Sequence, residues 1–218
     1  LGLSGIPYSG PDIGGFNGTP SAELYTRWLQ LATFLPFCRS HGAFTTPGRE
    51  PWYFGEPYLA ICRNFLRLRY RLLPYLYTLA WEASCSGAPL VRPLFWPDLT
   101  MAATAHMSDA FLLGNALLVV PVCEEQCREV SVYLPPDGWY CFWDNNLFEG
   151  GRATKVVAPL ERLPLFVRAG TVLPLEEDKM LVLHIYPPLP GQSRDHVVYS
   201  DAGDGYGPHR LDRFRLAW

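Results

Sequence analysis

One carboxylate near the start of the chain stands among glycines. The apolar run at residues 5–16 is interrupted at Asp12, with Gly10 before it and Gly14 and Gly15 after it. Glycine adopts backbone conformations closed to other residues, and it leaves room for a ligand to approach. The pattern predicts a short buried strand, ending near Asp12, that delivers this acid to a pocket.

A second apolar run ends in polar groups about one helix later. Residues 36–42 lead from Pro36 to Arg39 and His41, just before a glycine. Side chains two positions apart on a strand face the same side, so Arg39 and His41 are expected to point the same way. In a (β/α)8 barrel the carboxyl ends of the strands form the active site. Two such strands predict a site for a polyhydroxylated ligand.

Two aromatic residues, Phe16 and Trp52, are candidates to stack on the apolar face of a sugar ring. Core packing is the alternative for both: it is favoured for Phe16, and for Trp52 the two readings stay open. The alternative for Asp12 is a turn residue that accepts backbone N–H bonds. For His41 it is a neutral histidine satisfied by packing and one hydrogen bond.

No metal or cofactor is predicted. Cys123 and Cys127 have poor spacing for zinc and no histidine nearby. The stretch at residues 201–207 lacks the ligands of a calcium loop and is expected to form a turn. The sequence has no phosphate loop, dinucleotide fingerprint or G-x-S-x-G elbow.

The composition is that of a globular protein. The 218 residues are 49% hydrophobic and 18% charged, with a net charge of -3, which argues against a nucleic-acid partner. The most apolar run, at residues 111–123, is about 13 residues long, whereas a membrane span needs roughly 20. Six cysteines without a C-x-x-C pair are interpreted as reduced, mostly buried thiols. The chain begins with Leu1, so its compartment is left open, with the cytoplasm favoured.

Helical and β-rich segments divide the chain. Thr19 and Pro20 are expected to begin a helix over residues 20–34. A second helical region over 57–84 is expected to kink or restart near Leu73 because of Pro74. Short β-rich runs with turns between them follow, as in a β-sandwich. They are expected at residues 116–122, 130–134, 139–143, 155–158, 165–173, 181–186 and 197–199.

Several long motifs then carry a resemblance. GIPYSGPDIGGF, TRWLQLATFLPFCRSHG, REPWYFGEP, LRLRYRLLPYLYTLAWEA and PLFVRAGTVLP occur in this order over nearly the whole chain. Together they resemble the C-terminal part of glycoside hydrolase family 31, the α-glucosidase family. The resemblance implies an α/β plus all-β fold: the C-terminal part of a (β/α)8 TIM barrel over residues 1–97, a β-sandwich over 98–176, and the incomplete start of a second β-sandwich over 177–218.

The same resemblance implies a retaining α-glucosidase that releases terminal α-linked glucose from oligosaccharides by double displacement. By this resemblance, Asp12 matches a family position that holds or orients the sugar. His41 matches a histidine that contacts sugar hydroxyls, and Arg39 matches an arginine that supports the pocket. The family's nucleophile and acid/base match nothing in this chain, which is therefore expected to be inactive alone. An α-xylosidase of this family and a non-catalytic carbohydrate-binding or inactive homologue are the alternatives. The barrel part is expected to fold poorly by itself, since its strands leave unpaired edges.

Overall fold

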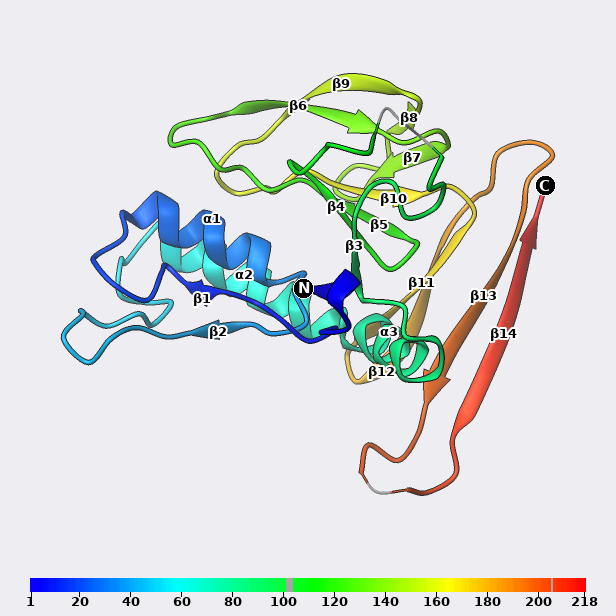
Figure 1. Cartoon of the computed structure of the whole chain (residues 1–218), viewed down its shortest axis with the longest axis horizontal. Helices are drawn as coiled ribbons and strands as arrows, with labels where there is room; N and C mark the ends of the chain where they lie inside the picture. Colours follow the sequence, from blue (N-terminus) through cyan, green and yellow to red (C-terminus); the bar gives the residue numbers. More distant parts are fainter. Residues whose placement is uncertain (101–103, 205) are drawn as a thin grey trace.

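The computed structural model describes residues 1–100, 104–204 and 206–218, so Gly205 of the expected turn at 201–207 lies outside it, as do three residues of the expected first sandwich. Its central layer is a six-stranded antiparallel sheet (Figure 1). The strands, in spatial order, are β3 (Val91–Arg92), β4 (Phe111–Leu113), β5 (Leu117–Val119), β10 (Leu165–Arg168), β7 (Gly138–Cys141) and β8 (Leu147–Glu149).

Each face of this sheet is buried against a different layer. Leu112, Leu118 and Phe166 point to one face and pack with Val132 and Leu134. The last two belong to β6 (Glu129–Leu134), which pairs with β9 (Arg152–Val157) as a separate two-stranded layer. Because successive strand residues face opposite sides, the neighbours of these residues in β4, β5 and β10 point to the helices instead.

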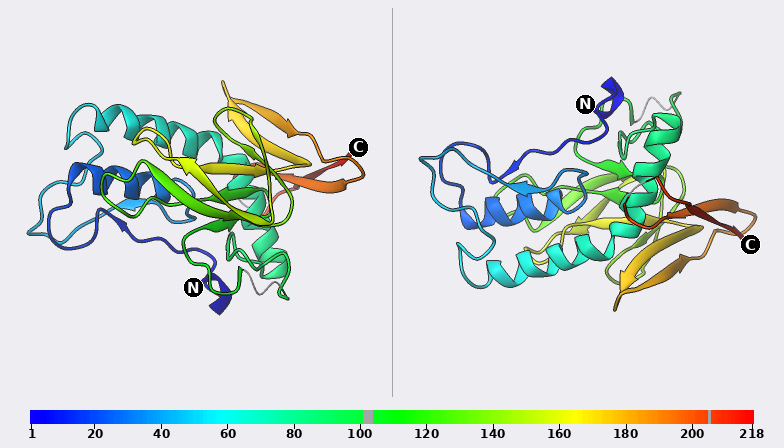
Figure 2. Two further views of the ribbon diagram at one scale, coloured as in Figure 1. Left: turned by 90° about the horizontal axis from the view of Figure 1, so that it is seen from above. Right: turned by 90° about the horizontal axis from the view of Figure 1, so that it is seen from below.

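Three helices cover that second face: α1 (Ala22–Ala32), α2 (Tyr58–Arg71) and α3 (Leu73–Ser86) (Figure 2). The N-cap of α1 is Ser21, whose hydroxyl accepts a hydrogen bond from Leu24 N at 3.2 Å, so the expected start at Thr19 and Pro20 is wrong by two residues. The expected break near Leu73 is confirmed, because Pro74 stands in the first turn of α3.

The N-terminal part is a β-α-β unit. A short 3-10 helix, η1 (Gly2–Ser4), precedes β1 (Asp12–Ile13), and α1 then crosses over to β2 (Arg39–Ser40). β1 and β2 pair in parallel and lie side by side next to α1 in Figure 1. A parallel pair joined through a helix is the repeating unit of a (β/α)8 barrel.

Buried polar contacts join α1 to the sheet layers. Arg27, buried in α1, donates to the backbone oxygens of Ala158 at 2.7 Å and Pro159 at 3.1 Å. Gln30, also buried, donates to the oxygen of Leu160 at 2.6 Å. These side chains fix the helix to the segment that leads into β10.

Two antiparallel ribbons complete the chain. β11 (Thr171–Glu177) pairs with β12 (Met180–Tyr186), and β13 (Ser193–Ser200) pairs with β14 (Arg210–Ala217). Hydrogen bonding places β3, which lies before the expected boundary at residue 97, in the central sheet, and the expected boundary at 176 falls within β11. The division into three domains, including a second β-sandwich, stays a prediction.

Candidate functional site

The parallel register of β1 and β2 places Asp12 directly beside Arg39. Arg39 Nε donates to Asp12 Oδ1 at 2.7 Å. The Asp12 side chain is 18% exposed and that of Arg39 is 49% exposed, so the pair borders solvent. The Arg39 guanidinium also lies over the ring of Phe37, 5.2 Å from its centroid. The structure thus presents a carboxylate and a guanidinium together, held by backbone pairing of the strands that carry them.

Phe16 and His41 meet in the loops that follow the two strands. Their ring centroids are 5.6 Å apart with the planes tilted by 36°. Ala43 N donates to Phe16 O at 2.8 Å, which ties the two loops together. Phe16 is 49% exposed and therefore lies outside the core, contrary to the packing alternative. The two rings offer an accessible aromatic face beside a histidine nitrogen.

The glycines around Asp12 have identifiable roles. A Cβ on Gly10 would lie 1.9 Å from Phe37 O, so only glycine allows the segments that lead into β1 and β2 to approach each other at this point. After the strand, Gly15 N donates to Asp12 O at 2.8 Å in a turn where Gly14 and Gly15 both have a φ of 82°. This conformation is strained for other residues. The turn sends the chain toward Phe16.

Arg49 joins these loops, and the sequence pattern assigned it no role. Its guanidinium is buried and donates to the oxygens of Gly14 at 3.1 Å and Gly18 at 2.8 Å. Its own backbone oxygen accepts from Tyr25 Oη at 2.7 Å and from Ser40 Oγ. Arg49 therefore fixes the loop after β1 against the residue at the end of β2. The signal available in the sequence was an arginine in a long loop next to glycines.

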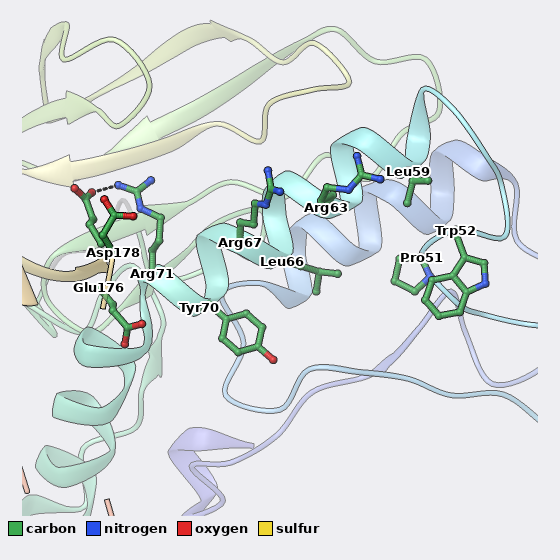
Figure 3. Close-up of a pocket in the computed structure, with 11 residues that line it drawn as sticks. Pro51, Trp52, Leu59, Arg63, Leu66, Arg67, Tyr70, Arg71, Glu176 and Asp178 are labelled. Carbon is green, nitrogen blue, oxygen red and sulfur yellow. Dashed lines mark hydrogen bonds and ion pairs between the residues drawn. The ribbon is translucent and has the colours of Figure 1, made fainter. Parts of the chain in front are cut away.

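Trp52 lines a groove to which the other four predicted site residues do not contribute. The groove has a volume of about 760 Å³ and runs along the outer side of α2, and its far end is formed by the turn after β11. Figure 3 shows Trp52 beside Pro51 at one end of this groove, with Arg63 and Arg67 along the helix and Arg71 bonded to an acidic group at the other end. The structure therefore brings Asp12, Arg39, Phe16 and His41 into one region. A small pocket of about 330 Å³ is lined by both His41 and Pro51, the residue before Trp52, so Trp52 follows directly on the edge of this region. A sugar contact at Trp52 stays a prediction.

Two family models match the chain in sequence order. The model described as the glycosyl hydrolases family 31 TIM-barrel domain matches residues 1–79, and the family 31 C-terminal domain matches residues 87–173. The chain belongs to glycoside hydrolase family 31. The barrel match covers β1, β2 and the loops after them, and the C-terminal match begins just before β3.

Named relatives of this family 31 chain are longer glycosidases. Alpha-glucosidase 2 of Bacillus thermoamyloliquefaciens is 37% identical over 99% of this chain and 28% of its own length. An alpha-xylosidase of Saccharolobus solfataricus is 37% identical over 94% of this chain and 29% of its own length. A solved family 31 dextranase of Flavobacterium johnsoniae, complexed with isomaltotriose, aligns with a TM-score of 0.89 and 34% identity over 94% of this chain and 27% of its own. The chain thus spans about 28% of the length of the first of these relatives.

The described part of the family 31 chain contains no cluster of three or more histidine, cysteine, aspartate or glutamate side chains that would hold a metal. Its six cysteines are unpaired, but Cys62 alone among them is buried and Cys85 and Cys123 are exposed, so the expectation of mostly buried thiols is wrong. Burial raises the pKa of the Cys62 thiol to about 11, so this cysteine is a packing residue and not a nucleophile. Within the same described residues, no helix has both the length and the apolar character of a membrane span.

Proposed function

We propose that the chain is the sugar-binding end of the catalytic barrel of a retaining α-glucosidase. The observation that supports this most directly is the Asp12 and Arg39 pair at 2.7 Å, next to Phe16 and His41, in a chain of family 31. A carboxylate, a guanidinium and an imidazole are the groups that exchange hydrogen bonds with sugar hydroxyls, and an exposed ring packs on the C–H face of a pyranose.

Asp12, Arg39 and His41 each have a separate role in the proposed sugar site. Asp12 accepts hydrogen bonds from hydroxyls of the terminal glucose, and Arg39 keeps the carboxylate in place and compensates its charge. His41 donates or accepts at a neighbouring hydroxyl. Hydrogen bonds of this kind lower the barrier when they shorten as the sugar distorts toward the oxocarbenium-like transition state.

We infer that the two carboxylates that break the glycosidic bond belong to another part of the complete protein. A retaining mechanism needs one carboxylate as nucleophile and one as acid/base, and we infer from the family resemblance that neither belongs to these 218 residues. We therefore expect the chain to contribute substrate binding and not turnover. The substrate class is an oligosaccharide with a terminal α-linked glucose, no metal or organic cofactor takes part, and the cytoplasm stays the expected compartment.

An α-xylosidase is the second candidate, because the α-glucosidase and the α-xylosidase relatives are equally identical to this chain at 37%. The motifs R-S-H-G and P-W-Y-F-G-E-P favour an α-glucosidase, because they resemble the sequences of the family's α-glucosidases more closely than those of its α-xylosidases. A non-catalytic carbohydrate-binding role is the third reading, and it predicts sugar binding without hydrolysis by the complete protein.

The test is hydrolysis of p-nitrophenyl α-glucoside and p-nitrophenyl α-xyloside by a complete protein that contains this chain, with the purified 218-residue chain as control. We expect turnover of the glucoside by the complete protein and none by the chain alone. Faster hydrolysis of the xyloside favours the α-xylosidase, and binding without turnover favours the non-catalytic reading. Turnover by the chain alone contradicts the placement of the catalytic carboxylates.

A further inference from the structure

A second cavity is lined by residues that come later in the sequence than those of the candidate sugar site. It has a volume of about 520 Å³ and lies between α3, the start of β11 and the inner side of β13. Figure 1 shows α3 beside β13 on the side of the molecule away from β1 and β2. Tyr75, Leu79, Val172 and Pro174 give it apolar walls. The volume of this cavity and its apolar lining are typical of a site that binds a small molecule.

Two arginines at this cavity share one buried carboxylate. Asp137, whose side chain is 8% exposed, is hydrogen-bonded to Arg194 Nη2 through Oδ2, and Arg168 Nε lies 3.7 Å from the same oxygen. The second carboxylate oxygen accepts from Gly138 N at 2.8 Å. One negative charge therefore faces two positive charges, and the cluster carries an excess positive charge.

The other charged groups of the lining do not cancel this excess. Glu82 is paired with the buried Arg92 at 2.9 Å. Asp195 is 78% exposed and faces Arg215 at the rim, 3.8 Å away. Burial lowers the pKa of the His196 imidazole, which is therefore neutral near pH 7.

The two guanidinium groups also have unused hydrogen-bonding capacity. The Nε atoms of Arg168 and Arg194 are both buried, and neither finds an acceptor among the described residues. The Arg168 side chain is 11% exposed, and its guanidinium lies 5.1 Å from the centroid of the Trp139 ring, which holds it in place. Both arginines are thus held beside the cavity, each with a buried donor that no hydrogen bond satisfies, which costs free energy.

We propose that this cavity binds a phosphate group, through hydrogen bonds from Arg168 and Arg194. Phosphate offers several charged acceptor oxygens to the planar fork of an arginine. Its charge compensates the excess positive charge of the cluster. The apolar walls leave room for an organic portion, so the group arrives either as free phosphate or on a small molecule such as a sugar phosphate.

The experiment is isothermal titration of the complete 218-residue chain with inorganic phosphate and, separately, with glucose 1-phosphate, at constant ionic strength set by sodium chloride. Saturable binding of either compound with a Kd below about 10 mM supports the site. Equal affinities identify the anion alone as the ligand, and tighter binding of glucose 1-phosphate identifies the phosphorylated molecule. Absence of saturable binding of both overturns the proposal.

Variants assign the binding to this cavity. Arg168→Met keeps an apolar stem over Trp139 and removes the charge, and we expect it to weaken binding at least tenfold. Arg67→Met, at an exposed position on α2, is the matched control and should leave the affinity unchanged. Arg194→Met serves if circular dichroism shows that the first variant is unfolded. Unaltered affinity in a folded Arg168 or Arg194 variant excludes this cavity as the binding site.

Discussion

The two oxygens of the Asp12 carboxylate are used differently. Within the described part of the chain, Arg39 Nε donates to Oδ1, and no hydrogen bond reaches Oδ2. The arginine thus holds the carboxylate and keeps a cation beside it, and in the proposed function the second oxygen accepts from a sugar hydroxyl. A turn aspartate has a different pattern, in which its side-chain oxygens accept from nearby backbone N–H groups, as Asp137 does from Gly138 N.

Replacing Asp12 by asparagine tests this difference in the complete enzyme. Asp12→Asn keeps the shape and removes charge-assisted hydrogen bonds worth about 1.5 to 3 kcal/mol each, so kcat/KM should fall roughly 10-fold to 150-fold. His41→Ala should also lower kcat/KM. Steady-state kinetics and melting temperature on the same samples check this, with Asp109→Asn at an exposed position as control. A lower melting temperature with unchanged kcat/KM would reject the substrate role of Asp12.

Arg49 acts through the loops that it joins. Arg49→Met removes its bonds to Gly14 O and Gly18 O, so we expect the free energy of unfolding to drop by about 2 to 3 kcal/mol. Displacement of the loop that carries Phe16 should also lower kcat/KM of the folded enzyme about tenfold.

Two further variants separate positioning from stability. Arg49→Lys should restore part of the stability but little of the activity, since an ammonium group does not reproduce the two-pronged geometry. Arg63→Met, at an exposed position in the α2 groove, is the control. Denaturant titration and steady-state kinetics are the measurements, and an Arg49→Met enzyme that is less stable but equally active would show a purely structural role.

Among the elements, α1 depends on polar contacts as much as on apolar ones. Its buried residues include Arg27 and Gln30, which bond to backbone oxygens of residues 158–162. At its N-terminus Glu23 pairs with Arg128 at 2.6 Å, just before β6. The helix is thus joined to the sheet layers at both a buried and a partly exposed point.

The Glu23 contact predicts a dependence of stability on pH. The hydrogen bond from Arg128 holds the pKa of Glu23 below its ordinary value of 4.5. Its stabilisation is therefore present above pH 4.5 and is lost as the pH falls through the folded-state pKa. Glu23→Gln should lower the free energy of unfolding by about 1 kcal/mol at pH 7, a small value because solvent screens the partly exposed Arg128. In acid the substitution should have almost no effect on the free energy of unfolding.

Urea denaturation of both proteins between pH 7 and about pH 3 measures this difference. Glu149→Gln serves as a control, because Glu149 pairs with Arg152 at an exposed site, 3.4 Å away. A Glu23→Gln deficit that stays constant down to acid pH would contradict the ion-pair account.

Local patterns predicted most elements but few of their partners. Gly170, with a φ of 76°, divides the expected strand at 165–173 into β10 and β11, which the apolar run concealed. β3 is only two residues long, lies in a segment bounded by Pro89 and Pro93, and is held by pairing with β4. β14 was missed although exposed Arg213 and Arg215 alternate with half-buried Phe214 and Leu216, which is a strand signal.

The candidate site was proposed from residues on the two strands or directly after them: Asp12 and Arg39 lie on β1 and β2, and His41 lies in the loop after β2, although it was expected on the strand. Asp12, Arg39 and His41 follow from polar residues at the ends of apolar runs. Arg49 and the position of Trp52 depend on how a long loop folds against its neighbours. No short-range pattern contains that information.

At the scale of the whole molecule, one apolar core crosses the boundary between the two family domains. Leu29 of α1, Phe65 of α2 and Leu79 of α3 belong to the same buried cluster as Leu117 and Val167 of the central sheet. The helices of the barrel part are therefore covered by the sheet. This revises what we expect of the helices within the 218-residue chain, while the expectation that residues 1–97 fold poorly by themselves stays a prediction.

Amide hydrogen exchange of the 218-residue chain tests the revised view. Opening α2 or α3 exposes the shared core, so their amides should be protected to a similar degree as those of β5 and β10. β1 and β2 form a two-residue pair whose outer edges have no neighbouring strand among the described residues, so their amides should exchange at least a hundredfold faster, about 2.7 kcal/mol less protection. Leu117→Ala provides the check on coupling: by opening a cavity in the shared core it should reduce protection in α2 and in the sheet together, by about 2 to 5 kcal/mol. Loss of protection confined to the sheet would show that the barrel helices and the C-terminal domain unfold independently.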